Sequence, residues 1–232
     1  MRFFLFSFTF LLVLASCSDD DYTTSSQSTS FENAYTYLAL GDSYTVGQSV
    51  CSSCSFPEQL ATRLNEQLER PTVVTPVAVT GWTTTNLLNG ISSANLQESY
   101  DLVTLLIGVN NQFRNLPFET FEQEFLELLD RAIDKAGGDI SKVIVLSIPD
   151  YTFTPFGSGL SASNSTEIDL YNNYIQSQTA LVGVRYVNIT DITRRGLDEP
   201  RLVASDGLHC SEVAYALFVD RFYSAAVTVI KE

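Results

Sequence analysis

Tyr35-Thr-Tyr-Leu-Ala-Leu40 runs directly into Gly41-Asp42-Ser43, so a mainly apolar segment ends at a glycine, an acid and a serine. A short apolar run of this kind is typical of a parallel strand that is covered on both faces. Open α/β sheets bind their ligands at the carboxyl ends of the strands. The sequence therefore predicts a buried strand over residues 35–40 that delivers Ser43 to the edge of a sheet where a site is expected.

The same pattern recurs twice downstream. Gly81 follows the apolar run Val77-Ala-Val79, and Gly108-Val-Asn110 follows Leu102-Val-Thr-Leu-Leu-Ile107. Hydrophobic periodicity predicts strands over 35–40, 73–79, 101–107, 142–148 and 184–189, and helices over 57–68, 83–91, 118–136, 166–181 and 211–227. Strands that alternate with helices predict an α/β fold, a three-layer α/β/α sandwich around a central, mainly five-stranded parallel sheet.

His209 is the only histidine of the chain, and it ends the segment Asp206-Gly207-Leu208-His209. A hydrolase with a serine nucleophile needs one imidazole as base and one carboxylate to orient it. A lone histidine in an ordinary turn before a helix is the simpler alternative. The small and amide-bearing residues at three strand ends favour the catalytic interpretation.

These segments resemble the SGNH (GDSL-type) hydrolases over about residues 35–226. Gly41-Asp42-Ser43 looks like the first block of that family, Gly81 the second, Gly108-Val109-Asn110 the third, and Asp206 to His209 the last. The resemblance implies that Ser43 is the nucleophile, with His209 as base and Asp206 as acid. It also implies an oxyanion hole made of the Ser43 and Gly81 N–H groups and the Asn110 amide. The third block of the family often ends in an aspartate, and Asn111 stands in its place here. We expect this departure to change the hydrogen bonds around Asn110 and not the chemistry.

The substrate is less well defined by the sequence, because the family includes lipases, lysophospholipases, thioesterases and carbohydrate acetylesterases. Aromatic and amide residues near the predicted site are candidates for substrate binding: Trp82, Asn111, Phe113, Tyr151 and Phe153. No apolar insertion of lid length is present, which predicts a small acyl site. We therefore expect a serine esterase acting on short-chain acyl esters or O-acetyl groups of carbohydrates. A lipid acylhydrolase and a catalytically silent surface glycan-binding lipoprotein are the alternatives.

Cys51-Ser-Ser-Cys54 permits three interpretations: a local disulfide, a thiol redox pair, or half of a zinc site completed by His209 and Cys210. A redox motif should open a helix, whereas Pro57 begins the predicted helix later. Adjacent residues such as His209 and Cys210 rarely bind one metal together. We expect a Cys51–Cys54 disulfide, no metal site and no cofactor.

The first residues predict export. Arg2 and the apolar run of residues 3–14 are typical of a signal peptide over 1–16, and Leu14-Ala-Ser-Cys17 resembles a bacterial lipobox. Acylated Cys17 would anchor the protein, with 17–32 as an acidic, Ser/Thr-rich tether and 33–232 as the hydrolase domain. This organisation predicts an outer-membrane or cell-surface lipoprotein of a Gram-negative bacterium, attached to the membrane through its lipid anchor only.

The net charge of −14 argues against two classes of partner. Nucleic acids and anionic lipid head groups both attract basic proteins, and here 27 acidic residues face 13 basic ones. The expected partner is a small-molecule or glycan ester substrate, and the domain is expected to be monomeric.

Overall fold

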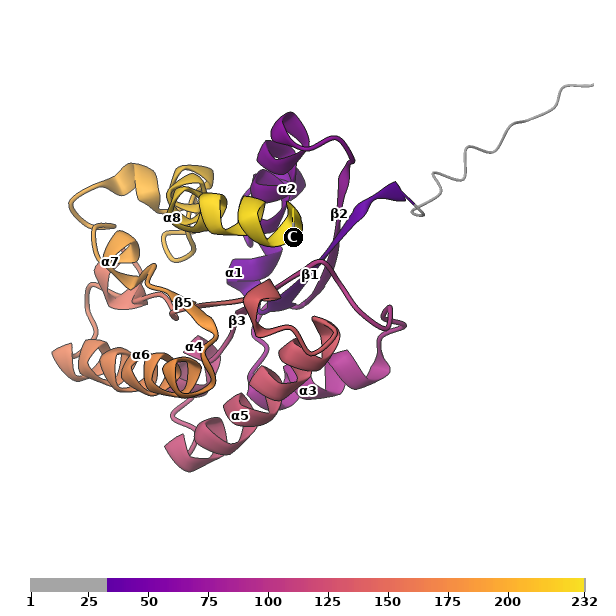
Figure 1. Cartoon of the computed structure of the whole chain (residues 1–232). Coiled ribbons are helices and arrows are strands. Elements are labelled where there is room, and N and C mark those ends of the chain that lie inside the picture. The colour runs from indigo at the N-terminus through magenta and orange to yellow at the C-terminus, as the bar shows by residue number, and fades with distance from the viewer. Residues whose placement is uncertain (1–32, 232) are drawn as a thin grey trace, which may run out of the picture. The chain divides into compact units, whose positions relative to one another are not determined.

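The computed structural model describes residues 33–231, so the predicted signal peptide, Cys17 and tether lie outside the described residues. These residues form a five-stranded sheet in the order β2-β1-β3-β4-β5 (Figure 1). All neighbouring strands are parallel. The strands are β1 (Tyr35–Gly41), β2 (Thr72–Ala78), β3 (Leu102–Leu106), β4 (Val143–Leu146) and β5 (Arg185–Val187).

The strand order changes direction at β1. From β1 the chain first adds β2 on one side and then returns to add β3 on the other, so that Gly41 pairs with both Ala78 and Leu106. In sheets of this order, ligands bind in the crevice beyond the carboxyl ends of the two strands at the reversal. The segments that follow β1 and β3 carry Ser43 and Asn110, the residues that the sequence singles out.

Two groups of helices cover the two faces of the sheet (Figure 1). On one face α2 (Phe56–Gln67) packs against α8 (Glu212–Lys231). On the other face α5 (Phe118–Lys135) lies between α3 (Thr84–Ser93) and α6 (Ala162–Val182). The predicted three-layer α/β/α sandwich with a five-stranded parallel sheet is therefore confirmed.

Apolar side chains at helical spacing explain how these helices attach. In α5 the buried residues are those of the predicted stripe: Phe121, Phe125, Leu128, Leu129 and Ala132. Helix α8 is long and apolar enough, by length and composition, to span a bilayer. Its buried residues, including Phe218 and Phe222, belong to the core, so in this fold α8 is a core helix.

Helix α6 begins four residues before the predicted limit of 166, and α8 ends four residues beyond the predicted limit of 227. The other differences that concern the site lie at the carboxyl edge of the sheet. β4 and β5 end two residues before the predicted limits of 148 and 189, and the residues beyond them turn into loops. The predicted loop after β1 begins with a one-turn helix, and similar turns follow β3 and β5. These short helices are α1 (Ser43–Val46), α4 (Val109–Phe113) and α7 (Thr190–Thr193), and the 3-10 turns are η2 (Ser52–Cys54), η3 (Ile140–Lys142), η4 (Tyr151–Phe153) and η5 (Pro200–Leu202).

Candidate active site

Ser43 is the first residue of α1, directly beyond the carboxyl end of β1. Asp42 caps this short helix, since its Oδ1 accepts a hydrogen bond of 3.0 Å from the Tyr44 N–H. A Cβ at Gly41 would lie 2.1 Å from Thr45 Oγ1 and 2.5 Å from the Leu106 carbonyl oxygen. Only glycine fits there, and its absence of a side chain lets the strand turn sharply into the serine.

A continuous hydrogen-bonded chain joins the three residues of the predicted triad. His209 Nε2 lies 3.0 Å from Ser43 Oγ, and His209 Nδ1 lies 2.6 Å from Asp206 Oδ2. Gly207, at φ +74°, reverses the chain between the acid and the base. A serine hydroxyl, an imidazole and a carboxylate in this order can remove the hydroxyl proton and stabilise the imidazolium that results.

Asp206 is held as a charged carboxylate by several donors. Burial raises the pKa of this carboxyl, but hydrogen bonds from His209 and Ser49 and from the N–H groups of Leu208 and His209 outweigh burial. Together they hold the pKa of Asp206 well below its usual range. Ser49 Oγ donates at 2.7 Å to Oδ2, and the two backbone N–H groups donate at 2.9 and 3.0 Å to Oδ1. The acid is thus fixed in position and ionised beside the imidazole.

The oxyanion side of the site gathers three potential donors. One N–H of the Asn110 side-chain amide donates to the Trp82 carbonyl at 3.0 Å. The other N–H faces Asp42 Oδ2 at 3.4 Å, a long contact that leaves this second N–H available to a substrate oxygen. Among the hydrogen bonds of residues 33–231, the N–H groups of Ser43 and Gly81 have no protein acceptor. Gly81 adopts φ +82°, a conformation that favours glycine, and its carbonyl accepts a 2.6 Å hydrogen bond from Arg114. Donors that already lack partners can meet the charge of a developing oxyanion without rearrangement.

A pocket of about 170 Å³ lies over these groups. Ser43, Gly81, Asn110 and His209 line it together, and its other lining residues are Tyr44, Thr80, Val109, Phe113, Tyr151 and Leu208. The Phe113 ring meets the Tyr151 ring edge-on, with centroids 5.5 Å apart. The Tyr151 hydroxyl donates to Gln112 Oε1 at 2.8 Å, which fixes that ring as one wall. The pocket is therefore mainly apolar, with its polar groups concentrated around Ser43.

Of the five candidate substrate-binding residues, Phe113 and Tyr151 line this pocket, whereas Trp82, Asn111 and Phe153 do not. The Trp82 ring packs on Gly90 of α3, where a Cβ would lie 2.4 Å from it. Asn111 is fully buried, accepts from the Thr84 N–H and donates to the Thr84 hydroxyl, so it fastens α4 to α3. Phe153 lies under the Arg194 guanidinium, 6.0 Å from the ring centroid.

Sequence reasoning missed five residues of the site. Four of them are chain neighbours of predicted residues: Tyr44 beside Ser43, Thr80 beside Gly81, Val109 beside Asn110 and Leu208 beside His209. Adjacency to the motif residues was a signal that could have identified them. Ser49 is the fifth, and its contact with Asp206 spans 157 residues, for which the local sequence offers no signal.

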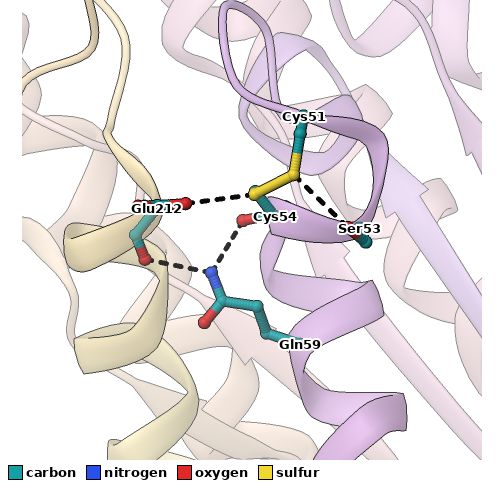
Figure 2. Close-up of a disulfide and its surroundings, with 5 residues drawn as sticks. All are labelled: Cys51, Ser53, Cys54, Gln59 and Glu212. Carbon is teal, nitrogen blue, oxygen red and sulfur yellow. Dashed lines mark hydrogen bonds between the residues drawn. A yellow bond between two sulfur atoms is a disulfide. The ribbon is translucent and has the colours of Figure 1, made fainter.

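Cys51 and Cys54 form a disulfide, as expected from their spacing (Figure 2). This pairing excludes both cysteines from the zinc site considered above, and no group of three metal-ligating side chains occurs among residues 33–231. Cys210 is a free, buried thiol whose pKa is raised by burial, so it is a poor nucleophile beside His209.

Comparisons with known proteins agree with this architecture. The sequence profile of the GDSL-like lipase/acylhydrolase family matches residues 39–217. The crystal structure of TesA is similar at a TM-score of 0.65 and 17% identity, covering 84% of this chain and 99% of that chain. A lipase/acylhydrolase from Enterococcus faecalis is similar at a TM-score of 0.62 and 22% identity, covering 85% of this chain and 94% of that chain. An acetyl-xylooligosaccharide esterase from Geobacillus is similar at a TM-score of 0.64 and 15% identity, covering 84% of this chain and 94% of that chain. No curated protein sequence matches the chain.

The structural likenesses, at such low identities, concern the fold alone. The family profile carries the assignment, since it extends over most of the chain and includes all the motif residues named above. The chain belongs to the GDSL-like lipase/acylhydrolase family and is an ester hydrolase.

Proposed function

We propose that this protein is a serine esterase in which Ser43, His209 and Asp206 form the catalytic triad. The hydrogen-bonded chain from Asp206 through His209 to Ser43, at the base of an open pocket, is the observation that carries the proposal. Ser43 Oγ attacks the ester carbonyl while His209 Nε2 takes its proton, and the proton then goes to the leaving alcohol. Water hydrolyses the acyl-enzyme by the same steps, with His209 again as base.

The charge that develops on the carbonyl oxygen needs donors placed on the opposite side of the acyl carbon from the base. We assign this role to the N–H groups of Ser43 and Gly81 and to the Asn110 amide. Each such donor is worth about 2.7–4 kcal/mol in other hydrolases.

The size of the pocket supports short acyl groups. Sites that enclose drug-sized ligands have volumes of about 300–1,000 Å³, well above the 170 Å³ found over Ser43. Each buried methylene contributes about 0.8 kcal/mol, and a long chain would leave most of its methylenes outside this pocket. We therefore propose acetyl to butyryl esters as substrates, including O-acetyl groups on carbohydrates, an activity named for one of the similar structures.

The lipid acylhydrolase is the alternative, and one surface feature fits both substrate classes. Phe113 is 48% exposed at the rim of the pocket and lies 6.2 Å from the ring of Phe156, which is 51% exposed. Such a pair could support the part of a long acyl chain that leaves the pocket, or equally stack on a sugar ring.

A panel of p-nitrophenyl esters from acetyl to palmitoyl, together with acetylated xylooligosaccharides, tests both substrate classes. We expect the highest kcat/KM for acetyl to butyryl esters and a decline from octanoyl onward, with Ser43→Ala as the inactive control. Palmitoyl or lysophospholipid substrates that exceed acetyl esters tenfold would replace the carbohydrate proposal by the lipid one. A wild-type protein that binds glycans but hydrolyses nothing would support the silent lipoprotein.

We also propose that the chain is exported and acylated at Cys17, on the basis of the sequence motif alone. Incorporation of labelled fatty acid into the wild type, and none into Cys17→Ser, is the expected result. Equal labelling of both would contradict the proposal.

A further inference from the structure

The loop between α1 and α2 touches both sides of the pocket. Ser49 Oγ donates to the Asp206 carboxylate at 2.7 Å, on the same oxygen that faces His209. Its neighbour Gln48 accepts a 2.7 Å hydrogen bond from Thr80, which precedes Gly81. This one loop, residues 47–55, thus contacts the acid of the proposed triad and the strand end that carries the proposed oxyanion glycine.

Ser49 occupies an unfavourable backbone conformation to make its contact. Its φ is +67°, and apart from Asn115 it is the only non-glycine residue at positive φ among residues 33–231. The left-handed region is strained for a residue with a Cβ other than asparagine or aspartate, so surrounding structure must hold it there. Ser49 is also exposed, so burial does not supply that constraint.

The disulfide stands two residues further along the same loop. Figure 2 shows how Cys51–Cys54 closes the end of the loop where it meets the first turns of α2 and α8. Gln59 Nε2 donates to the Cys54 carbonyl at 2.7 Å and to the Glu212 carbonyl at 3.0 Å, and Cys54 Sγ lies 3.1 Å from the Glu212 carboxylate. The disulfide therefore closes residues 51–54 of the loop into a covalent ring, and Gln59 links the carbonyl of Cys54 to the start of α8.

We propose that Ser49 is a positioning residue for the Asp206–His209 pair, and that the Cys51–Cys54 disulfide keeps it in place, so that the esterase activity depends on the redox state of this disulfide. The inference rests on the proposed triad. Cys51 is exposed and Cys54 half-buried, so a reductant can reach the bond, whereas Cys210 is buried and stays outside the reaction.

The redox step is a thiol–disulfide exchange with a dithiol. One thiolate of the dithiol attacks a sulfur of the bond and forms a mixed disulfide, and its second thiolate then releases the protein. The dithiol loses two electrons and becomes a disulfide, while Cys51 and Cys54 gain those electrons and, with two protons, become thiols. Residues 51–54 are then no longer closed into a ring, the loop loses its only covalent cross-link, and Ser49 can relax away from positive φ and from Asp206.

Two substitutions at position 49 separate the hydroxyl from the backbone. Ser49→Gly accepts positive φ without strain but has no donor, and Ser49→Asn tolerates positive φ and keeps an amide donor. With p-nitrophenyl acetate we expect Ser49→Gly to lose about tenfold in kcat with KM little changed, and Ser49→Asn to recover most of the loss.

The pH dependence of kcat/KM distinguishes a positioning role of Ser49 from a purely structural one, because loss of a structural contact alone would not shift it. Without the Ser49 hydrogen bond the Asp206 charge acts more strongly on the imidazolium. The acid limb of the kcat/KM profile of Ser49→Gly should therefore shift upward, by about half a pH unit. An unshifted profile with wild-type kcat would overturn the positioning role.

Reduction with dithiothreitol tests the link to the disulfide. We expect five- to tenfold loss of kcat in the wild type, the same loss in Cys51→Ser/Cys54→Ser without any reductant, and no further loss on reduction of Ser49→Gly, because both changes remove one interaction. Ser52→Ala, at an exposed position of the same loop, is the matched control and should respond to reduction like the wild type. Equal losses on reduction in the wild type and Ser49→Gly, or no loss in either, would overturn the proposal.

This outcome is distinct from failure of the proposed function. An oxidised wild-type protein without esterase activity would refute the triad itself. An oxidised protein that is active, and whose kcat does not change when the disulfide is reduced, would refute only the redox link.

Discussion

Two aspartates lie near Ser43, and their surroundings differ in almost every respect. Asp42 precedes Ser43 in the chain and is completely buried, and Asp206 lies 163 positions away in sequence and is partly exposed. Burial raises the pKa of Asp42 to about 7, because the hydrogen bonds that oppose it, from the Tyr44 N–H, the Asn110 amide and its own backbone N–H, do not outweigh it. Four hydrogen-bond donors hold the pKa of Asp206 well below its usual range.

The comparison shows which carboxylate can serve the imidazole. A carboxylate stabilises an imidazolium only if it is ionised at working pH and contacts the ring. Asp206 meets both conditions, whereas Asp42 accepts from the Tyr44 N–H at the start of α1, makes a long contact of 3.4 Å with the Asn110 amide, and has no hydrogen bond to His209. Proximity in sequence to the nucleophile is therefore a poor guide to the acid, and the number of donors around each carboxylate is a better one.

The largest effect is expected at the nucleophile and the base, which only one of the two aspartates can serve. Ser43→Ala and His209→Ala should each reduce kcat by about 10⁴-fold or more, and the double variant should be little worse, because the triad acts as a unit. Steady-state kinetics on p-nitrophenyl acetate measures this, with circular dichroism to establish that both variants fold. Wild-type turnover in His209→Ala would end the hypothesis, since the chain has no second histidine.

Replacing each of the two aspartates by asparagine in turn tests the comparison directly. Asp206→Asn should lose about 10³–10⁴-fold in kcat, because the amide favours the wrong tautomer of His209. Asp42→Asn should lose less than about tenfold, because an asparagine at this position can still cap α1. A larger loss for Asp42→Asn than for Asp206→Asn would reverse the assignment.

The third effect is smaller and concerns the oxyanion side. Asn110→Ala should lower kcat by about 10²–10³-fold with little change in KM, since its amide acts on charge that appears only in the transition state. Asn111→Ala is the neighbouring control and is expected to reduce stability rather than kcat, because its amide bonds only Thr84. A rise in KM at constant kcat for Asn110→Ala would place this amide in ground-state binding instead.

The fold and the core of the site could be predicted because both depend on local patterns. Buried parallel strands are apolar runs, and the residues that follow them at the reversal of strand order must meet at one edge. This is why Ser43, Gly81 and Asn110 converge although the sequence separates them. The Asp206-x-x-His209 pair was predictable because an acid and a base three residues apart can meet across one turn.

The rest of the site depends on side-chain directions and distant contacts that no local pattern encodes. Trp82 follows the predicted Gly81, yet the turn at that glycine sends its ring onto Gly90 of α3. The hydrogen bond from Ser49 to Asp206 joins segments 157 residues apart. The environment of Asp42 likewise depends on how completely the sheet and helices enclose it, which the sequence pattern does not express.

The smallest expected effect concerns stability rather than activity, and it follows from the raised pKa of Asp42. Its folded-state pKa of about 7 exceeds the ordinary value of 3.8, so the folded protein holds this proton over a range where the unfolded chain has released it. Its contribution to stability is complete below about pH 4 and is lost as pH rises through about 7, a loss of at most about 4 kcal/mol.

Asp42→Asn keeps the helix cap without this titration. Its melting temperature relative to the wild type should therefore rise between pH 5 and pH 8. A difference between Asp42→Asn and the wild type that stays constant over this range would mean that Asp42 is already ionised in the folded protein at pH 5. The contrast between the two aspartates would then rest on their contacts alone.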